Sequence, residues 1–184
     1  QYCTFLKDKT NHSELDAIVD LITNNETYFF RTDYQLATFS RHLLPLLFKK
    51  NQAKKKLRIW SAGCSSGEEP YTLAILIKES KLPFGDWDIE IFGSDINKKV
   101  LKTARQGIYH SNSFRNTDQY RLNKYFNKGG PDTFLIKNEI KEMVFFGRMN
   151  LLDPKCRQLK SMDLIVCRNV LIYFDQKVKN KVID

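Results

Sequence analysis

A glycine loop or polar residues follow or end each of four apolar stretches that are typical of buried strands. Gly63 follows the first stretch, Asp95 ends the second, Asn150 ends the third, and Arg168 and Asn169 end the fourth. In an open sheet of parallel strands, ligands bind in the crevice beyond the carboxyl ends of the strands. Each residue alone could be an ordinary turn residue or helix cap, but four such strand ends together indicate one ligand site.

The residue types narrow the chemistry of that ligand. An acid such as Asp95 at the end of the second strand can accept hydrogen bonds from both ribose hydroxyls of an adenosine cofactor, or it could cap the following helix. The loop GCSSGEE (63–69) contains glycines that let the backbone approach a ligand closely. It lacks the Lys-Ser/Thr pair of a Walker loop, which argues against ATP as the ligand. It also lacks the G-x-G-x-x-G pattern, which weakens the case for NAD.

Two adjacent acids in this loop favour a cationic ligand. Glu68 and Glu69 would repel a pyrophosphate, whereas S-adenosylmethionine carries a positive sulfonium and a positive ammonium beside its ribose and adenine. We expect Glu68 to suit that cofactor and Glu69 to be a solvent-facing acid in the first turn of the next helix.

The elements that must position these residues alternate between strand and helix. Helices are predicted over 14–22, 34–48, 70–80, 97–105 and from about 175 onward, and strands over 57–62, 87–95, 143–152 and 162–174. Short loops between alternating strands and helices are typical of a parallel α/β sheet. In the helix over 34–48, with Thr32 or Asp33 as its cap, the expected apolar stripe is Leu36, Phe39, Leu43, Leu46 and Leu47.

The pattern breaks between about 108 and 142. This segment is polar with scattered aromatic residues, and YFNKGGPDTFLIKN (125–138) predicts two short strands around a glycine turn. We therefore expect a small antiparallel insertion in the parallel fold.

Composition and charge limit the classes of function that the chain can have. The 184 residues suit one domain, and the net charge of +9 favours an acidic partner such as nucleic acid, anionic lipid or an acidic protein. No apolar run reaches about 18 residues, so no membrane span is expected, and the first residues lack the apolar core of a signal peptide. The cysteines at 3, 64, 156 and 167 lack the spacing of a metal or redox site, so free thiols in a reducing cytoplasm and no bound metal are expected.

The chain resembles the CheR family of chemotaxis receptor methyltransferases in five segments. In order and spacing these are TNNETYFFR (23–31), RIWSAGCSSGEEPYTLAI (58–75), GSDI (93–96), NLL (150–152) and CRNVLIYF (167–174). The resemblance implies a Rossmann-like class I methyltransferase sheet with helices on both faces, a preceding helical domain, and a small β subdomain that contacts receptors. It assigns 1–50 to the end of the helical domain and a linker, and 51–184 to the methyltransferase domain, whose last strands are expected to be missing.

The matching positions also imply site residues. Cofactor-binding roles are implied for Asn25, Thr27, Arg31, Gly63, Glu68, Asp95, Asn150, Leu151, Asn169 and Val170. Positioning roles in catalysis are expected for Arg31, Asn169 and Tyr173. Arg31 suits a bidentate contact with a carboxylate, either that of the cofactor's methionine part or that of a substrate glutamate.

The implied reaction is methyl transfer from S-adenosylmethionine to glutamate carboxylates, which leaves S-adenosylhomocysteine. The implied substrate is the acidic helical cytoplasmic region of chemotaxis receptors, and the enzyme is expected to be a cytoplasmic monomer with no nucleic-acid partner and no membrane insertion. A glutamate with a pKa of about 4.3 is ionised at neutral pH, so no general base is needed. The basic residues expected to contact this partner are Arg41, Arg105, Arg115, Arg121, Lys124 and Lys128.

Two alternatives stay open. The chain could be an S-adenosylmethionine-binding signalling module without turnover. It could also be a nucleic-acid methyltransferase, which fits the basic charge but predicts an N/D-P-P-Y/F motif where this chain has CRNV (167–170).

Overall fold

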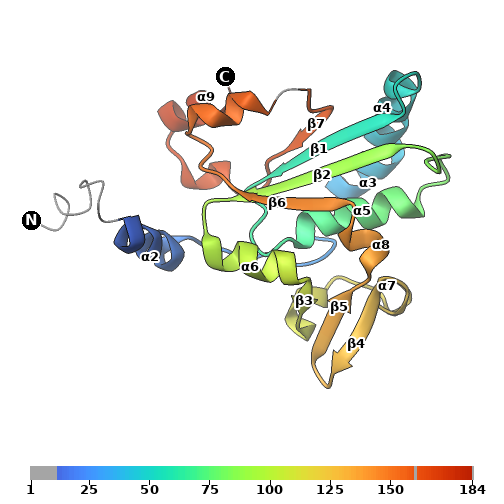
Figure 1. The fold of residues 1–184 in the computed structure, drawn as a ribbon, viewed down its shortest axis with the longest axis horizontal. Coiled ribbons are helices and arrows are strands. Elements are labelled where there is room, and N and C mark those ends of the chain that lie inside the picture. Colours follow the sequence, from blue (N-terminus) through green and yellow to red (C-terminus); the bar gives the residue numbers. More distant parts are fainter. Residues whose placement is uncertain (1–11, 160, 184) are drawn as a thin grey trace, which may run out of the picture.

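Four parallel strands form the central sheet of the computed structural model, which describes residues 12–159 and 161–183 (Figure 1). In the spatial order β6-β2-β1-β7, the strands are β6 (Val144–Arg148), β2 (Asp88–Asp95), β1 (Lys56–Ala62) and β7 (Leu164–Val166). Neighbouring strands pair in parallel, which confirms the predicted α/β class. Because β1 and β2 lie in the middle, the residues that follow Ala62 and Asp95 meet at the centre of one edge.

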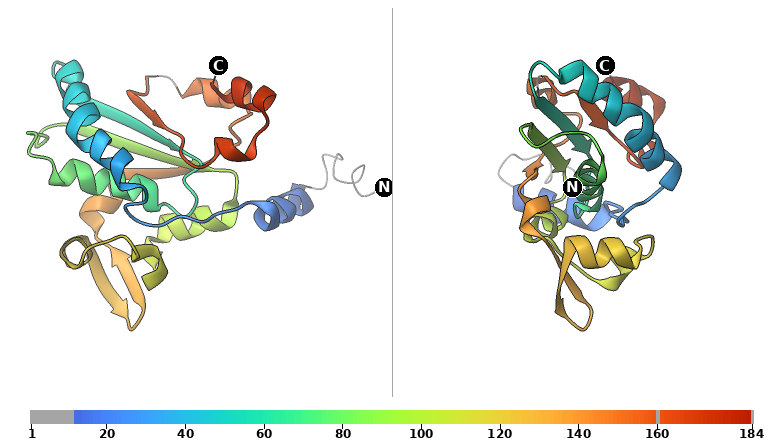
Figure 2. Two further views of the ribbon diagram at one scale, coloured as in Figure 1. Left: turned by 180° about the vertical axis from the view of Figure 1, so that it is seen from behind. Right: turned by 90° about the vertical axis from the view of Figure 1, so that its right-hand side faces the viewer.

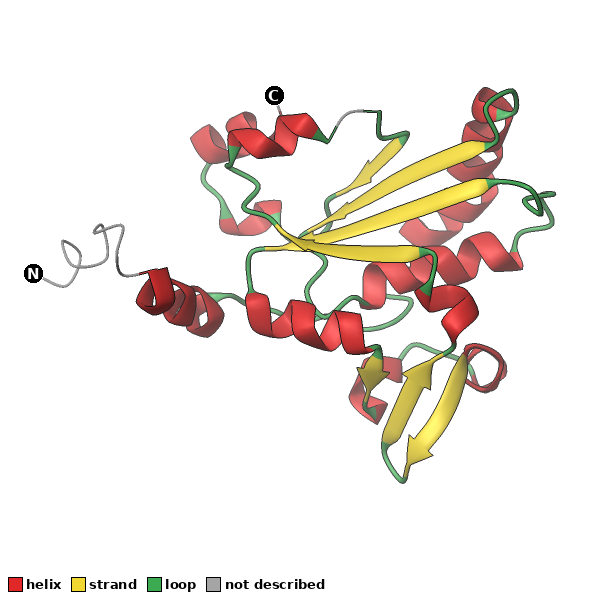
Figure 3. Ribbon diagram, viewed as in Figure 1, coloured by secondary structure: helices red, strands yellow, loops and turns green. Residues whose placement is uncertain are grey.

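Helices pack on the face of the sheet that carries Leu57, Ile59 and Ile91. These three side chains are fully buried, and α5 (Glu68–Glu79) contacts β2 and β6 beneath them. α6 (Lys98–Gln106) contacts the same two strands, and Figure 3 shows the helices grouped under the sheet. On the opposite face, a row of apolar side chains crosses the strands in register: Phe145, Phe92, Trp60 and Ile165.

The long helix predicted over 34–48 is interrupted by a π-helical turn. It consists of α3 (Asp33–Thr38), the π turn η1 (Phe39–Leu43) and α4 (Leu44–Asn51), which lies against β1 (Figure 2). The wider turn shifts the register of α4 by about one residue. The prediction that Leu43 and Leu46 face the core is therefore wrong: both are exposed, while Leu44 and Leu47 are buried.

The helix starts at one of the two predicted caps, but without a capping side chain. Thr32 is the N-cap residue, but its backbone is left-handed with φ of 65° and its side chain caps no backbone N–H. Asp33 instead accepts a hydrogen bond from Asn116 Nδ2 at 2.7 Å. The helix entrance is thereby tied to the insertion.

The insertion contains an antiparallel sheet of three strands, one more than the two that the sequence predicted around the glycine turn. Its spatial order is β3 (Ile108–Tyr109), β5 (Thr133–Ile136) and β4 (Phe126–Gly130). Short helices complete it: η2 (Ser111–Phe114), α7 (Gln119–Tyr125) and α8 (Asn138–Lys141).

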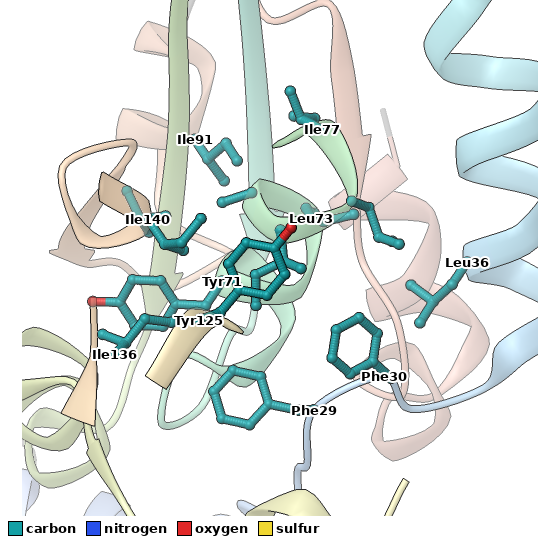
Figure 4. Packing of buried hydrophobic residues seen from close by; sticks show 14 of the residues in the cluster. Phe29, Phe30, Leu36, Tyr71, Leu73, Ile77, Ile91, Tyr125, Ile136 and Ile140 are labelled. Atoms are coloured by element: carbon teal, nitrogen blue, oxygen red, sulfur yellow. The ribbon is translucent and has the colours of Figure 1, made fainter. Parts of the chain in front are cut away.

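Phe29 joins the insertion to the segment before α3. Its ring stacks on Phe114 at 5.1 Å between centroids and meets Phe126 edge-on at 4.9 Å. Figure 4 shows Phe29 and Phe30 beside Tyr71 of α5 in the same buried cluster. The segment 23–31 is therefore packed against the insertion and against α5.

The remaining elements surround the carboxyl ends of the strands. They are α2 (His12–Ile22), η3 (Pro154–Gln158), η4 (Leu171–Tyr173) and α9 (Gln176–Ile183). β6 ends at Arg148 and β7 at Val166, so Asn150 and Asn169 lie in the loops that follow rather than at the predicted strand ends. In the described residues, no helix is long and apolar enough to cross a membrane.

Candidate active site

A cavity of about 520 Å³ lies beyond the carboxyl ends of the parallel strands. A volume of this size suits a ligand as large as a nucleoside cofactor. Nearly all residues proposed from the sequence line it, namely Asn25, Thr27, Arg31, Gly63, Asp95, Asn150, Leu151, Asn169, Val170 and Tyr173. The exception is Glu68.

The first loop of the cavity depends on Gly63. Its φ is +77°, and a Cβ atom there would lie 2.4 Å from Val170 Cγ2. Its N–H and that of Cys64 both donate to the carbonyl oxygen of Ser94 at 2.8 Å, so the loop stays attached to β2. Only glycine combines this backbone conformation with such a close approach.

Asp95 presents a carboxylate that the backbone already holds in place. Oδ2 accepts from Ser65 N at 2.8 Å, Oδ1 accepts from Asn97 N at 2.9 Å, and the residue is 8% exposed. The cap of α6 is Asn97, whose Oδ1 accepts from Lys99 N and Val100 N. Asp95 is therefore not needed as the helix cap, and each of its oxygens keeps lone pairs for ligand hydroxyls.

The two adjacent acids do not lie as expected, because Glu69 lines the cavity and Glu68 does not. Glu68 is 2% exposed and points to the insertion, where Oε1 accepts a hydrogen bond from Ser113 Oγ at 3.0 Å. Its Oε2 accepts another from Ser66 Oγ of the glycine loop at 2.7 Å. Glu69 lines the cavity and accepts from Ser61 Oγ at 2.7 Å. The expectation of a solvent-facing Glu69 is wrong, because its side chain is 14% exposed.

Burial governs the electrostatics of both acids. Burial raises the pKa of Glu68, whereas the hydrogen bond from Ser66 lowers it. Burial also raises the pKa of Glu69, while the hydrogen bond from Ser61 and the positive charge of Arg168 lower it. Asp95, Glu69 and Glu26 line the cavity together with Arg31 and Arg168, so its acids outnumber its basic groups, which favours a ligand with a positive charge.

The segment 23–31 forms the next wall. Asn25 Nδ2 donates to the carbonyl oxygen and Oγ1 of Thr23, both at 3.0 Å. The carbonyl oxygen of Asn25 accepts from Ser65 Oγ at 2.8 Å, which fastens this wall to the glycine loop. Arg31 Nη1 folds back onto the carbonyl oxygen of Glu26 at 2.7 Å.

The loop after β7 closes the cavity from the other side. Asn169 has φ of 57°, a left-handed conformation that asparagine tolerates better than most residues. Tyr173 accepts a hydrogen bond from Asn24 Nδ2 at 2.9 Å, which links this loop to the segment 23–31.

Sequence reasoning missed several lining residues. Glu69 and Arg168 supply charge, and Tyr28 and Cys64 also line the cavity. The sequence places Arg168 at the same predicted strand end as Asn169, but no role was assigned to it. The apolar wall is formed by Val19, Ile22, Ile96, Met149, Leu151 and Leu152.

The lining fits a cationic nucleoside. The apolar wall offers a surface for a base, Asp95 suits ribose hydroxyls, and Glu69 suits an ammonium or sulfonium. Cys64, Cys156 and Cys167 are free thiols, and Cys3 lies outside the described residues. Across 12–159 and 161–183, no cluster of His, Cys, Asp or Glu could hold a metal ion.

Comparison with known proteins agrees with this geometry. Residues 25–184 match the family described as "CheR methyltransferase, SAM binding domain". The chemotaxis protein methyltransferase of Borreliella burgdorferi is 41% identical over 186 residues, which covers 98% of this chain and 65% of that protein. Chemotaxis protein methyltransferase 2 of Vibrio cholerae is 38% identical over 175 residues, which covers 95% of this chain and 60% of that protein.

The chain thus spans 60–65% of the length of these two relatives. Among solved structures, it resembles magnesium protoporphyrin IX methyltransferase (ChlM) from Synechocystis with bound SAM. That likeness has a TM-score of 0.39 and 18% identity, and it covers 98% of this chain and 67% of the other. It is too distant to bear on the ligand or the substrate.

Proposed function

Because the chain belongs to the CheR methyltransferase family, whose SAM-binding domain it matches, we propose that it methylates glutamate carboxylates of chemotaxis receptors. The reaction forms a glutamate methyl ester and leaves S-adenosylhomocysteine. The observation that carries the proposal is the pair of acids, Asp95 and Glu69, in one cavity at the carboxyl edge of the sheet. A phosphate-bearing cofactor would be repelled there, whereas a cationic nucleoside is stabilised.

Each part of the cofactor has a matching part of the cavity. Asp95 holds the ribose hydroxyls, while Asn150 and Leu151 lie beside the adenine on the apolar wall. Glu69, rather than Glu68, accepts the ammonium of the methionine part. Asn25, Thr27, Gly63 and Val170 complete the wall around it.

The protein acts mainly by alignment. When bound, the cofactor supplies a methyl group on a sulfonium, which is already an activated leaving group. The acceptor carboxylate is ionised at neutral pH, so no side chain has to remove a proton. Arg31, Asn169 and Tyr173 line the cavity and are placed to orient the incoming carboxylate.

The proposed partner is the acidic helical cytoplasmic region of a receptor, met by a monomer in the cytoplasm. A net charge of +9 favours such a surface. Of the six basic residues expected at this contact, Arg121 is engaged in the protein itself, with Nη2 at 2.8 Å from Glu79 Oε2. Arg105 Nη2 donates to the carbonyl oxygen of Phe146. Arg115 also forms an ion pair, with Glu26, but its side chain is 48% exposed against 29% for Arg121, so Arg115 is the stronger candidate of the two, beside Arg41, Lys124 and Lys128.

Methyl-labelled cofactor tests the proposal. The full-length protein is offered a glutamate-rich receptor fragment together with a pool of RNA and DNA. We expect label on the receptor fragment alone, and mild alkali should release it as methanol because the product is an ester. Label on nucleic acid, or label that survives alkali, would show that the substrate class is wrong.

The same experiment distinguishes a methyltransferase from the alternative, a signalling module that binds S-adenosylmethionine without turnover. A signalling module would bind S-adenosylhomocysteine in calorimetry yet transfer no label to any acceptor. Asp95→Ala serves as the control for both readouts, because loss of the two ribose contacts should abolish binding and labelling together.

A further inference from the structure

The guanidinium of Arg168 connects two parts of the cavity wall, at Arg31 and Glu69, with Gln35 of α3. Nε donates to Gln35 Oε1 at 2.5 Å, and Nη2 donates to the carbonyl oxygen of Arg31 at 2.5 Å. Nη1 lies 3.2 Å from Glu69 Oε2. The side chains of Arg168 and Glu69 are 15% and 14% exposed, so water screens their ion pair little.

These contacts fix the Glu69 carboxylate at both oxygens. Ser61 Oγ donates to Oε1 at 2.7 Å, while Arg168 takes Oε2. A carboxylate held by two partners from different elements cannot rotate away from the cavity that it lines. These two contacts therefore hold Glu69 in one orientation.

The same guanidinium also holds the backbone around Arg31. The residues on either side, Phe30 and Thr32, have φ of 56° and 65°. Left-handed backbone at residues other than glycine persists only where the surroundings hold it in place. The bond from Arg168 to the carbonyl oxygen of Arg31 supplies one such hold, and the bond from Phe30 N to Thr72 Oγ1 supplies another.

From these contacts we propose that Arg168 is a positioning residue, which orients the Glu69 carboxylate and the Arg31 backbone for the cofactor. It need not touch the cofactor itself to do so. The inference rests on the proposed function, since it takes the cavity to be the S-adenosylmethionine site.

The charge of Arg168 has a second effect on Glu69. Burial raises the pKa of Glu69, and the hydrogen bond from Ser61, then Arg168, then the more distant Arg31, lower it. The thiols of Cys64 and Cys167 are the other titratable groups near it. Without Arg168, Glu69 should hold its proton to a higher pH, and a neutral acid attracts an ammonium only weakly.

Calorimetry with S-adenosylhomocysteine between pH 5 and pH 8 tests the role of Arg168. We expect Arg168→Met to raise Kd about tenfold or more near neutral pH. The pH below which affinity falls should also move upward. Arg168→Lys, which keeps the charge and loses the planar fork, should restore part of the pH profile but not the full affinity. If Arg168→Met folds poorly, Arg168→Lys replaces it in the same measurement.

Making Arg168→Met in a Glu69→Gln protein tests whether Arg168 acts through the Glu69 carboxylate or only stabilises the cavity wall. In that background, Arg168→Met should cost much less affinity and should shift no pH midpoint. An equal loss in both backgrounds, or an unchanged Kd and pH profile in Arg168→Met, would overturn the inference.

Side-chain carboxylate NMR of the ligand-free protein gives an independent readout. Arg168→Met should raise the titration midpoint of Glu69 even where no cofactor is present. If the parent protein binds no S-adenosylhomocysteine while this shift is seen, the proposed function fails and the positioning of Glu69 stands. If the midpoint of Glu69 does not move, the inference fails whatever the protein binds.

Discussion

Glu68 and Glu69 are adjacent in the first turn of α5, and an α-helix advances about 100° with each residue. That rotation directs Glu68 to Ser113 in the insertion and Glu69 to Ser61 and the cavity. One acid thus joins two parts of the fold, and the other is available to a ligand. Although the two residues are adjacent, we expect substitution of Glu69 to change ligand affinity and substitution of Glu68 to change stability.

Replacing each acid by glutamine should separate these effects. Glu69→Gln loses a charge-assisted contact to the ligand, worth about 1.5–3 kcal/mol, so Kd for S-adenosylhomocysteine should rise roughly ten- to hundredfold. Glu68→Gln keeps the size of a side chain that points away from the cavity, so it should leave Kd nearly unchanged. Calorimetry on the pair is decisive, because a larger loss in Glu68→Gln would reverse the assignment.

The buried Glu68 also predicts a pH dependence of stability. Burial raises its pKa above the ordinary 4.5, so the folded state binds this proton more tightly than the unfolded state. The resulting stabilisation is present below about pH 4.5 and is lost as the pH rises through the raised pKa. Glu68→Gln cannot titrate, so its stability relative to the parent should improve as the pH increases from 4 to 8.

Thermal unfolding across that pH range measures the difference. Glu139→Gln, at an exposed position on α8, controls for the substitution itself. A difference between Glu68→Gln and the parent that stays constant with pH would contradict this account.

The sequence predicted which strand ends carry polar groups but not which acid faces the cavity. Asp95, Asn150 and Asn169 line the cavity, as their positions after apolar stretches indicated. The orientation of Glu69 depends on where α5 begins, and that is set by Gly67, an N-cap residue with φ of 94°. Local sequence patterns do not specify such a backbone angle.

At the scale of elements, the cavity exists because loops from distant parts of the chain approach closely. The glycine loop after β1 and the loop after β7 meet at Gly63 and Val170. The segment 23–31 meets the glycine loop at Asn25 and Ser65. Small residues and backbone contacts therefore allow these loops to come together at this end of the sheet.

Gly63→Ala should destabilise the fold. The added Cβ would lie 2.4 Å from Val170 Cγ2, and φ of +77° disfavours any L side chain. Overpacking costs about 1–3 kcal/mol, and a left-handed alanine costs roughly 1–2 kcal/mol more. Urea unfolding measures the loss.

Gly85→Ala is the matched control for Gly63→Ala. A Cβ atom at Gly85 would meet no atom within 4 Å, so its stability should change by less than about 1 kcal/mol. Equal unfolding free energies for the two variants would show that the contact with Val170 is not a constraint.

Hydrophobic periodicity located the helices and strands but could not foresee a π turn. The apolar residues Leu43, Leu44, Leu46 and Leu47 satisfy either of two registers. The structure buries Leu44 and Leu47 because η1 widens one turn. The choice depends on packing against β1 and its neighbours, which a single-helix pattern does not contain.

At the scale of the whole molecule, charge should affect how the protein meets its partner. The chain carries a net charge of +9, and the cavity mouth carries its own basic group. Arg115 lies over the ring of Tyr28 at 3.7 Å and pairs with Glu26 at 2.6 Å. Glu26 and Tyr28 line the cavity, whereas Lys54 lies exposed just before β1, at the amino ends of the strands.

Salt should therefore weaken substrate docking more than cofactor binding. The Debye length falls from about 10 Å at 0.1 M to about 3 Å at 1 M, which screens exposed charges but affects partly buried contacts much less. We expect KM for an acidic receptor fragment to rise with ionic strength while Kd for S-adenosylhomocysteine changes little. Arg115→Gln should raise that KM at low salt more than Lys54→Gln does, although each removes one positive charge. Its loss also leaves the carboxylate of Glu26 unpaired at the mouth, where it repels an incoming glutamate, whereas Lys54 is remote from the carboxyl edge of the sheet. Equal effects of the two variants would mean that net charge alone attracts the partner, and a KM independent of salt would mean that charge does not attract it at all.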